Sequence, residues 1–288
     1  MANLKEIRSR IASVTSTRQI TSAMKMVAAA KLRKAQTFVS QIVPYKNKMQ
    51  EILSLLNEAL QEDRDNVFAT KREVKTMLVV AVSSNKGLCG GFNGNIFKQC
   101  VALKEKVLEK NPSIDLQFYA VGRKISEQLQ KGGFKVYKSF NEAIDKVEYS
   151  TSAAIAQEVT DLFLEKKFDS IKLVHNEFVN PAVQNATEND FLPLNFKASA
   201  SKFKSDYIFE PDKQTIVRQL IPQWLKTVVF SALAESFAGE QGARMTAMNK
   251  ATDNATELIK DLNLQYNKVR QASITNEIIE IVSGANAH

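Results

Sequence analysis

The residues with the clearest potential for chemistry lie in one glycine-rich segment, 83–94, which reads Ser-Ser-Asn-Lys-Gly-Leu-Cys-Gly-Gly-Phe-Asn-Gly. It lies between a predicted strand and a predicted helix, where glycine-rich loops bind phosphate groups. The details do not match such a site. The glycines lack the GxGxxG spacing, no Gly-Lys-Ser/Thr sequence ends the loop, and the second strand ends at Gly122 without an acidic residue. We therefore interpret the segment as a tight strand-to-helix turn.

A second candidate is the thiol of Cys89, which a nearby Lys86 could activate by lowering its pKa. A catalytic thiol also needs a base, and neither His175 nor His288 is recognisable as one from its sequence context. Cys100 forms no CxxC or metal-ligand spacing with Cys89. We therefore expect no catalytic residue, no cofactor and no metal site, and we interpret Cys89 as a small buried residue.

The elements that would position these residues alternate between strands and helices, which predicts a Rossmann-like parallel α/β domain over residues 73–209. A polar linker, 61–72, precedes this domain, and the polar segment 180–206 is interpreted as a loop or an irregular strand pair. The predicted strands are Thr76–Ser83, Leu116–Val121, Phe134–Tyr137 and Ser170–Phe178, and the predicted helices are Asn95–Lys110, Arg123–Lys131 and Ser152–Lys166.

The C-terminal segment, 210–288, contains almost no helix breakers after Pro211. We predict one helix over residues 212–285, capped by Asp212 and about 110 Å long. A helix of this length needs a long partner, and its second half has the 3–4 spacing of a coiled coil. The seam positions are Ala238, Gln241, Met245, Met248, Thr252, Ala255, Ile259, Leu262, Tyr266, Val269 and Ser273.

The N-terminal segment, 1–60, is the natural partner, because it also reads as a long helix. Its seam is lost around Arg18 and Thr21 and resumes at Ala35, and Pro44 marks either a kink or a break between two helices. Since the chain leaves along one helix and returns along the other, the fold class is α/β with a long antiparallel two-helix coiled coil formed by the terminal segments.

Charge is concentrated in the N-terminal segment. Of the net charge of +8, residues 1–60 contribute +7, from 10 Lys and Arg against 3 Asp and Glu. This basic segment predicts an acidic partner. The 24% charged fraction is typical of a soluble protein, and the apolar runs are too short to span a bilayer. We recognise no signal peptide.

Three other interpretations remain open from the residues alone. One is a homodimeric coiled-coil scaffold whose α/β domain binds a ligand, which predicts a parallel dimer. Another is a nucleic-acid-binding arm, although the basic helix has few aromatic residues and no groove-reading motif. An enzyme would need a cofactor in the loop 87–94.

Three stretches together resemble the γ subunit of F-type ATP synthases, and the likeness covers essentially the whole chain. They are 20–29 (ITSAMKMVAA), 84–93 (SNKGLCGGFN) and a C-terminal run that contains ARMTAM, YNKVRQASIT and IVSGA. The resemblance implies a central rotor stalk that transmits torque between an ion-driven membrane c-ring and catalytic β subunits. It implies contacts with the α and β subunits, the ε subunit and the c-ring, none with nucleic acid, and none with the membrane except through the c-ring.

The resemblance also implies which residues contact partners. Arg270, Gln271 and Thr275 match the part of the shaft that engages a loop of the β subunit. The other implied contacts are Met24, Lys25, Lys31 and Arg33 near an acidic β-subunit lever, and Ile278, Ile281 and Val282 in an apolar tip that fits a hydrophobic collar. The chain lacks the regulatory cysteine insert of chloroplast members and shows no transit peptide. The expected location is the cytoplasmic face of a bacterial inner membrane.

Overall fold

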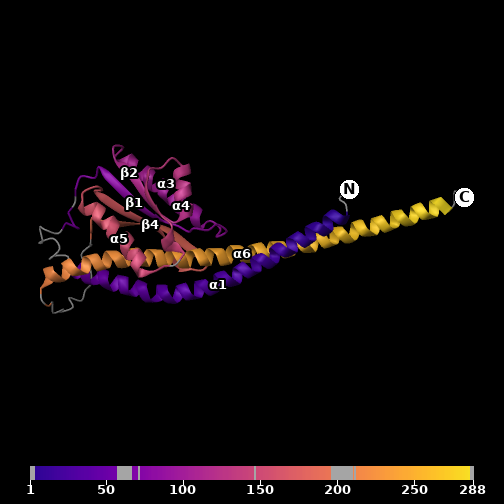
Figure 1. The fold of residues 1–288 in the computed structure, drawn as a ribbon, viewed down its shortest axis with the longest axis horizontal. Coiled ribbons are helices and arrows are strands. Elements are labelled where there is room, and N and C mark those ends of the chain that lie inside the picture. Colours follow the sequence, from indigo (N-terminus) through magenta and orange to yellow (C-terminus); the bar gives the residue numbers. More distant parts are fainter. Residues whose placement is uncertain are drawn as a thin grey trace. The chain divides into compact units, whose positions relative to one another are not determined.

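The structure is a computed structural model that describes residues 4–56, 67–70, 72–145, 147–195, 210 and 212–285 (Figure 1). It divides into two units: the first comprises residues 1–29 and 244–288, and the second comprises residues 30–243. Two long helices, α1 (Leu4–Leu55) and α6 (Lys213–Ala285), contribute residues to both units. In the described part of the chain, no helix has an apolar stretch long enough to cross a membrane.

The second unit contains a five-stranded sheet in the order β3-β2-β1-β4-β5. Its first four strands are parallel, whereas β5 runs antiparallel to β4. The predicted parallel arrangement is confirmed for these four strands, whereas β5 lies in the segment 180–206, which was interpreted as a loop or an irregular strand pair. The strands are β1 (Thr76–Val82), β2 (Asp115–Val121), β3 (Val136–Phe140), β4 (Ser170–Asn180) and β5 (Val183–Leu192).

The reversal between β4 and β5 has a local cause. The side-chain oxygen of Asn180 accepts hydrogen bonds from the backbone N–H groups of Ala182 and Val183, at 2.9 and 2.8 Å. An asparagine that bonds the backbone two residues ahead is a standard turn former. The polar composition that predicted a loop is thus the composition of a hairpin turn and of a half-exposed edge strand.

Helices cover both faces of the sheet. Alternate residues of β1 point to opposite faces, so Val79 packs on the side of α3 (Phe92–Lys110) and α4 (Arg123–Lys131), and Val80 on the other side. That second side is covered by η1 (Glu142–Ile144), by α5 (Tyr149–Leu164) and by residues of both long helices, among them Leu53, Leu56, Leu225 and Leu233.

In the second unit, α6 begins at an N-cap, as predicted. The carboxylate of Asp212 accepts hydrogen bonds from the N–H and the hydroxyl of Thr215, at 2.8 and 2.7 Å. These bonds lower the pKa of Asp212.

From Trp224 to Gln241 nearly every residue of α6 is buried. Over residues 30–55, α1 runs through Pro44 as one helix, so the alternative of two helices was wrong.

In the first unit, residues 4–29 of α1 pair with residues 244–285 of α6 in opposite directions. The hydroxyls of Thr21 and Thr252 lie 2.9 Å apart, and the ammonium of Lys25 donates to the side-chain oxygen of Asn249 at 2.6 Å. The predicted antiparallel coiled coil is confirmed. The predicted seam residues of α6 from Met248 onward are all buried or half-buried.

One detail of the predicted N-terminal seam was wrong. The seam is not lost around Arg18 and Thr21, because Thr21 is buried and Arg18 and Lys25 are half-buried. The apolar pattern stops there only because polar side chains occupy the same inward positions. Thr21 bonds across the interface, and Lys25 does so with Asn249. Hydrophobic periodicity therefore cannot detect seam positions whose polar side chains form hydrogen bonds across the helix pair.

Candidate partner-contact surfaces

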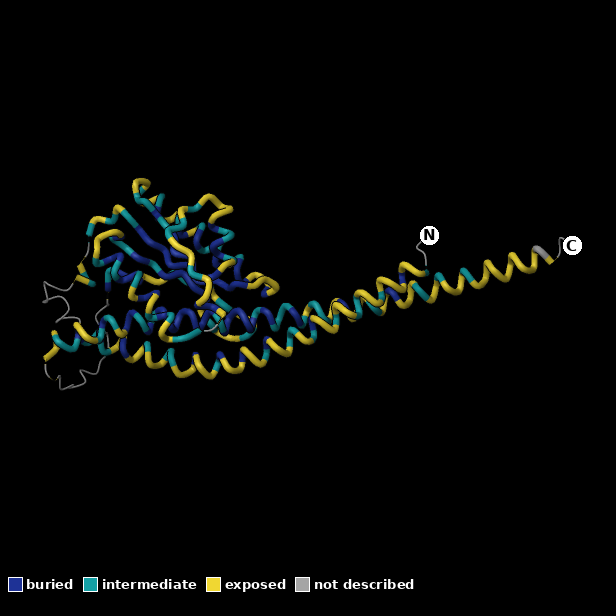
Figure 2. The backbone as a smooth tube through the Cα atoms, in the orientation of Figure 1, coloured by how far each residue is buried: buried dark blue, intermediate teal, exposed yellow. Residues whose placement is uncertain are grey.

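The end of α6 is the most exposed surface of the first unit. The Thr21–Thr252 and Lys25–Asn249 contacts set a register in which Leu4, the first described residue of α1, lies near Val269. Beyond this point α6 has no helix beside it in the described part of the chain. After Ser273, every residue of α6 whose burial is described is exposed, as Figure 2 shows.

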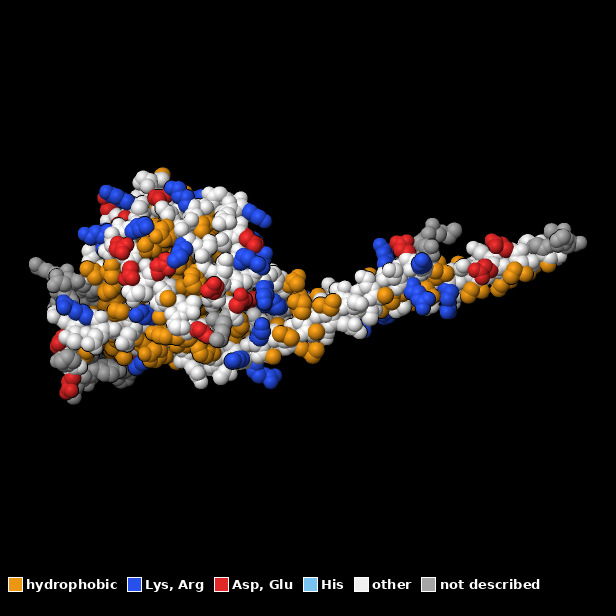
Figure 3. All heavy atoms as spheres, viewed as in Figure 1, with side chains coloured by type: hydrophobic (Ala, Val, Ile, Leu, Met, Phe, Trp, Pro, Cys, Tyr) orange, Lys and Arg blue, Asp and Glu red, His pale blue; other side chains and the backbone are white. Residues whose placement is uncertain are grey.

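The residues expected to contact partners on this end differ in character. Arg270 and Gln271 are exposed, and the hydroxyl of Thr275 donates to the backbone carbonyl of Gln271 at 2.9 Å. The side chains of Ile278, Ile281 and Val282 are 55, 71 and 53% exposed. Figure 3 shows hydrophobic side chains along one side of this end. Contiguous exposed apolar side chains mark interaction sites more often than isolated ones do.

Two further expected contacts, Met24 and Lys25, are half-buried in the helix pair of the first unit. Because the Lys25 ammonium donates to Asn249, its hydrogen-bonding capacity is partly used within the pair. The apolar side chains that α1 does expose nearby are those of Ile20, Met26 and Val27. These three residues were not among the sequence-based candidates.

In the second unit, Lys31 and Arg33 are both exposed on α1 but have different surroundings. Lys31 lines a pocket of about 330 Å³ together with Lys34 and Phe38, and Arg33 is not part of its lining. The pocket could not be found from the sequence, because its other walls come from α6 and from the segment after η1.

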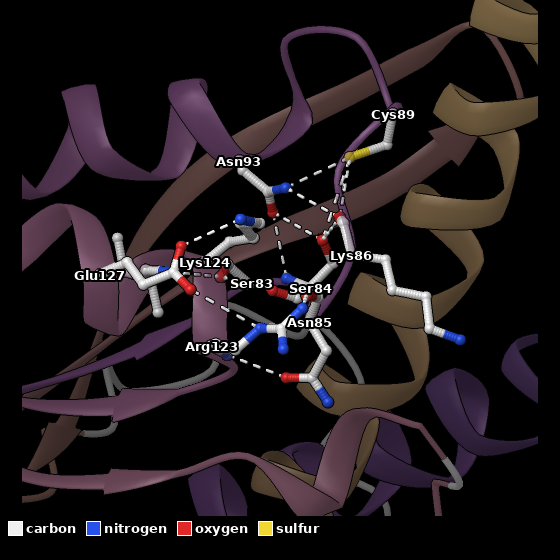
Figure 4. A network of polar contacts seen from close by, with 10 residues as sticks. Ser83, Ser84, Asn85, Lys86, Cys89, Asn93, Arg123, Lys124 and Glu127 are labelled. Atoms are coloured by element: carbon white, nitrogen blue, oxygen red, sulfur yellow. Dashed lines mark hydrogen bonds and ion pairs between the residues drawn. The ribbon is translucent and has the colours of Figure 1, made fainter.

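The glycine-rich segment is a turn whose polar groups bond one another, as Figure 4 shows. The side-chain oxygen of Asn93 accepts the N–H and hydroxyl of Ser84, at 3.1 and 2.9 Å. The amide of Asn93 in turn donates to the carbonyl of Lys86 at 3.3 Å and to the sulfur of Cys89 at 3.3 Å. These polar groups thus form hydrogen bonds that shape the loop.

The loop is also tied to the neighbouring strand end. The side-chain oxygen of Asn85 accepts a hydrogen bond from the backbone N–H of Arg123 at 2.9 Å. The guanidinium of Arg123 donates a hydrogen bond to the backbone carbonyl of Asn85 at 3.1 Å. The Cys89 side chain is buried, as the sequence predicted. Burial raises the pKa of the other thiol, Cys100, to about 12, so it stays protonated at neutral pH. Among the described residues, no group of three or more His, Cys, Asp or Glu side chains could hold a metal ion.

A buried polar cluster joins β4 to both long helices within the second unit. Glu235 of α6 accepts the hydroxyl of Ser231 at 2.7 Å and the ammonium of Lys46 at 3.2 Å. Its other oxygen lies 3.9 Å from Nε2 of His175. Burial lowers the pKa of His175 to about 4, so the imidazole is neutral at neutral pH. The sequence signal for this cluster was Glu235 inside the apolar run that begins at Trp224.

Together these features define a class of protein that combines an antiparallel pair of long helices with an α/β domain. A helix pair with small and polar seam residues is joined to an α/β domain, and its longest helix exposes apolar side chains at one end. The comparisons with known proteins identify the family. The family model described as ATP synthase matches residues 3–287. The chain therefore belongs to the ATP synthase gamma-chain family, as the sequence resemblance predicted.

Close relatives match the chain from end to end. The ATP synthase gamma chain of Christiangramia forsetii is 51% identical over 287 residues, covering 100% of this chain and 99% of the relative. That of Flavobacterium johnsoniae is 48% identical over 288 residues, with the same coverage. The chain is thus a gamma subunit of an F-type ATP synthase, the subunit of the central stalk.

Solved structures agree with this fold. A chain from the central stalk and c-ring of the Tetrahymena thermophila mitochondrial ATP synthase is 26% identical, with a TM-score of 0.59, covering 81% of this chain and 99% of that one. A chain from the rotor of the Euglena gracilis enzyme has a TM-score of 0.65 at 19% identity, covering 94% and 98%. At that identity the likeness shows the fold alone.

Proposed function

We propose that this subunit is the rotor shaft of its complex and transmits torque between an ion-driven c-ring in the membrane and the catalytic β subunits. It has no catalytic site of its own. In this role residues 1–60 and 210–288 form the shaft and residues 73–209 form its foot. The observation that carries the proposal is the exposed end of α6, where a row of apolar side chains has no helix beside it among the described residues.

The proposed partners follow from the character of each surface. The apolar residues Ile278, Ile281 and Val282 fit a hydrophobic collar formed by the α and β subunits. Arg270, Gln271 and Thr275 are the proposed contacts with a β-subunit loop, and Met24, Lys25, Lys31 and Arg33 with an acidic β-subunit segment. The foot is the proposed contact with the ε subunit and the c-ring, at the cytoplasmic face of a bacterial membrane.

The first-unit geometry supports this role over a homodimeric scaffold. A parallel dimer would need the seam around Met248, Ala255 and Leu262 for a second copy. In the structure that seam is filled by the chain's own α1, which pairs with it through Thr21 and Lys25. Small and polar seam residues also allow two helices to approach closely, which favours a thin shaft.

The test is purification of the tagged chain from its native membranes, followed by an ATPase assay. We expect α and β subunits to co-purify with magnesium-dependent activity. Replacing Arg270 and Gln271 together by Ala should then reduce activity or assembly severalfold. The matched control is Lys260→Ala with Gln265→Ala, which removes similar exposed side chains from the same helix. A chain that purifies alone as a dimer without ATPase activity would refute the proposal.

A further inference from the structure

A pocket of ligand size among the described residues of the second unit has walls that differ chemically from one another. Its volume of about 330 Å³ lies at the lower end of the range typical of small-molecule sites. One wall is a single face of α1, formed by Lys31, Lys34, Ala35 and Phe38. These positions are three, four and seven residues apart, so their side chains project from the same side of the helix.

The opposing walls are mainly apolar. They consist of Ala234 and Phe237, which lie three residues apart on α6, and of Val147 after η1. Two of the wall residues, Ala35 of α1 and Ala234 of α6, have small side chains that are buried. Phe38 is held in place by an edge-to-face contact with Phe230, at a centroid distance of 5.2 Å.

The charges in the pocket favour an anion on the α1 side. Lys31 and Lys34 have no hydrogen bond or ion pair with any described residue. The one acidic wall residue is Asp145, from a different element, and its carboxylate accepts the side-chain amide of Asn85 at 2.9 Å. The pocket is thus lined by two lysines and by one carboxylate that is already hydrogen-bonded.

We propose that this pocket binds a small monoanion with an apolar body, of the class of medium-chain carboxylic acids. The carboxylate lies at Lys31 and Lys34, and the hydrocarbon chain packs on Phe38, Phe237 and Val147. Such a ligand bridges α1, α6 and the segment after η1 within the second unit. The inference does not rest on the proposed rotor function, but it shares Lys31 with the proposed β-subunit contact, so its test uses the isolated full-length chain.

The first experiment is isothermal titration calorimetry of the full chain with octanoate. We expect one binding site per chain with a dissociation constant on the order of 0.1–1 mM, the range open to a ligand of this size. Octanol should bind about fivefold to tenfold more weakly, and octyltrimethylammonium should not bind. Absence of octanoate binding at about 10 mM, or equally tight binding of octanol, would overturn the proposal.

Variants locate the site. Lys31→Gln with Lys34→Gln should weaken octanoate binding about fivefold to tenfold, because each exposed charge pair contributes modestly. The matched control is Arg33→Gln, which removes a positive charge from the same turn outside the pocket and should change the affinity less than about twofold. Ala35→Leu should abolish binding by filling the pocket. If the lysine double variant or a folded Ala35→Leu binds octanoate like the wild type, the ligand lies elsewhere and the proposal fails.

Discussion

One helix, α6, has two contrasting environments. In the second unit its residues from Trp224 to Gln241 are buried almost all round, by α1, α5 and the sheet. In the first unit its described side chains after Ser273 are all exposed, although the helix continues to Ala285. The buried part is therefore a core element of the fold. The exposed part contributes little to folding, and its isoleucines contact no other described part of the chain closely enough to be buried.

The contrast also separates two uses of small and polar residues. In the buried part, Ala232 and Ala234 let neighbouring elements come close, and Glu235 is paired with Lys46 and Ser231. In the first unit, the polar seam residues bond across only two helices. A core surrounded on all sides tolerates little change, whereas a two-helix seam is already half in water.

The largest expected effect is in the buried part. Leu233 has no exposed surface, and Leu233→Ala removes packed methyl groups from the core cluster. We expect a loss of about 2–5 kcal/mol in the free energy of unfolding. The measurement is denaturant unfolding followed by fluorescence of Trp224, the single tryptophan. The matched control is Leu264→Ala, an exposed leucine of the same helix, with an expected change within about 0.5 kcal/mol. Equal effects of the two variants would contradict the contrast.

The second prediction concerns pH and the buried cluster. Burial lowers the pKa of His175 to about 4, against an ordinary value of 6.5 for the unfolded chain. Between pH 4 and pH 6.5 His175 binds more protons in the unfolded chain than in the folded protein. The folded protein is therefore most stable, with respect to this group, above about pH 6.5, and it loses stability as the pH falls towards 4. The expected loss at pH 4 is about 3 kcal/mol relative to pH 7.

The comparison that isolates this effect is His175→Gln, which cannot titrate. Its unfolding free energy should fall less between pH 7 and pH 4 than that of the wild type, by about 3 kcal/mol. The groups that face His175 are Glu235 and Lys46, and both remain in the variant. Identical pH profiles for the two proteins would show that His175 does not become protonated on unfolding.

A third prediction tests how closely the β4–β5 hairpin packs on α6. A Cβ atom at Gly242 would lie 2.9 Å from the carbonyl oxygen of Pro181 and 3.0 Å from its Cα, both backbone atoms. At Gly239 the nearest atoms belong to the side chains of Gln184 and Phe92, at 3.1 and 3.2 Å. Gly242→Ala should therefore destabilise the second unit by about 1–2 kcal/mol despite the higher helix propensity of alanine. Gly239→Ala should cost less, since side chains can move. The reverse order in Trp224-monitored unfolding would contradict this account.

How far the sequence predicts this structure depends on the kind of signal. The start of α6 at Asp212 and its run to Ala285 follow from a capping residue and from the scarcity of helix breakers. The strands β1, β2 and β4 follow from their apolar runs, whereas β3 overlaps the predicted strand Phe134–Tyr137 only at Val136 and Tyr137. The antiparallel strand β5 was not assigned a direction, because its polar residues suit both a loop and an edge strand.

The candidate surfaces were less predictable, because they depend on the partners of each side chain. The sequence marked Lys25 and Lys31 as members of one basic segment. In the structure Lys25 donates to Asn249, whereas Lys31 lines a pocket. The Lys46–Glu235–His175 cluster joins three elements far apart in the chain, and no local pattern reports such a contact.

The smallest effect on stability is expected at the exposed end of α6, where the comparison with the buried part is most sharply tested. Ile281 is 71% exposed, so Ile281→Ser removes almost no buried surface and should change the unfolding free energy by less than about 0.5 kcal/mol. If the apolar row serves a hydrophobic collar, the same variant should still fold but co-purify with less α and β subunit. The control is Glu277→Gln, also exposed, which should leave both properties unchanged. Thermal unfolding followed by circular dichroism measures the stability of each variant, and the pull-down yield of α and β subunits measures its assembly. A variant that assembles normally would leave the exposed isoleucines without a role in partner contact.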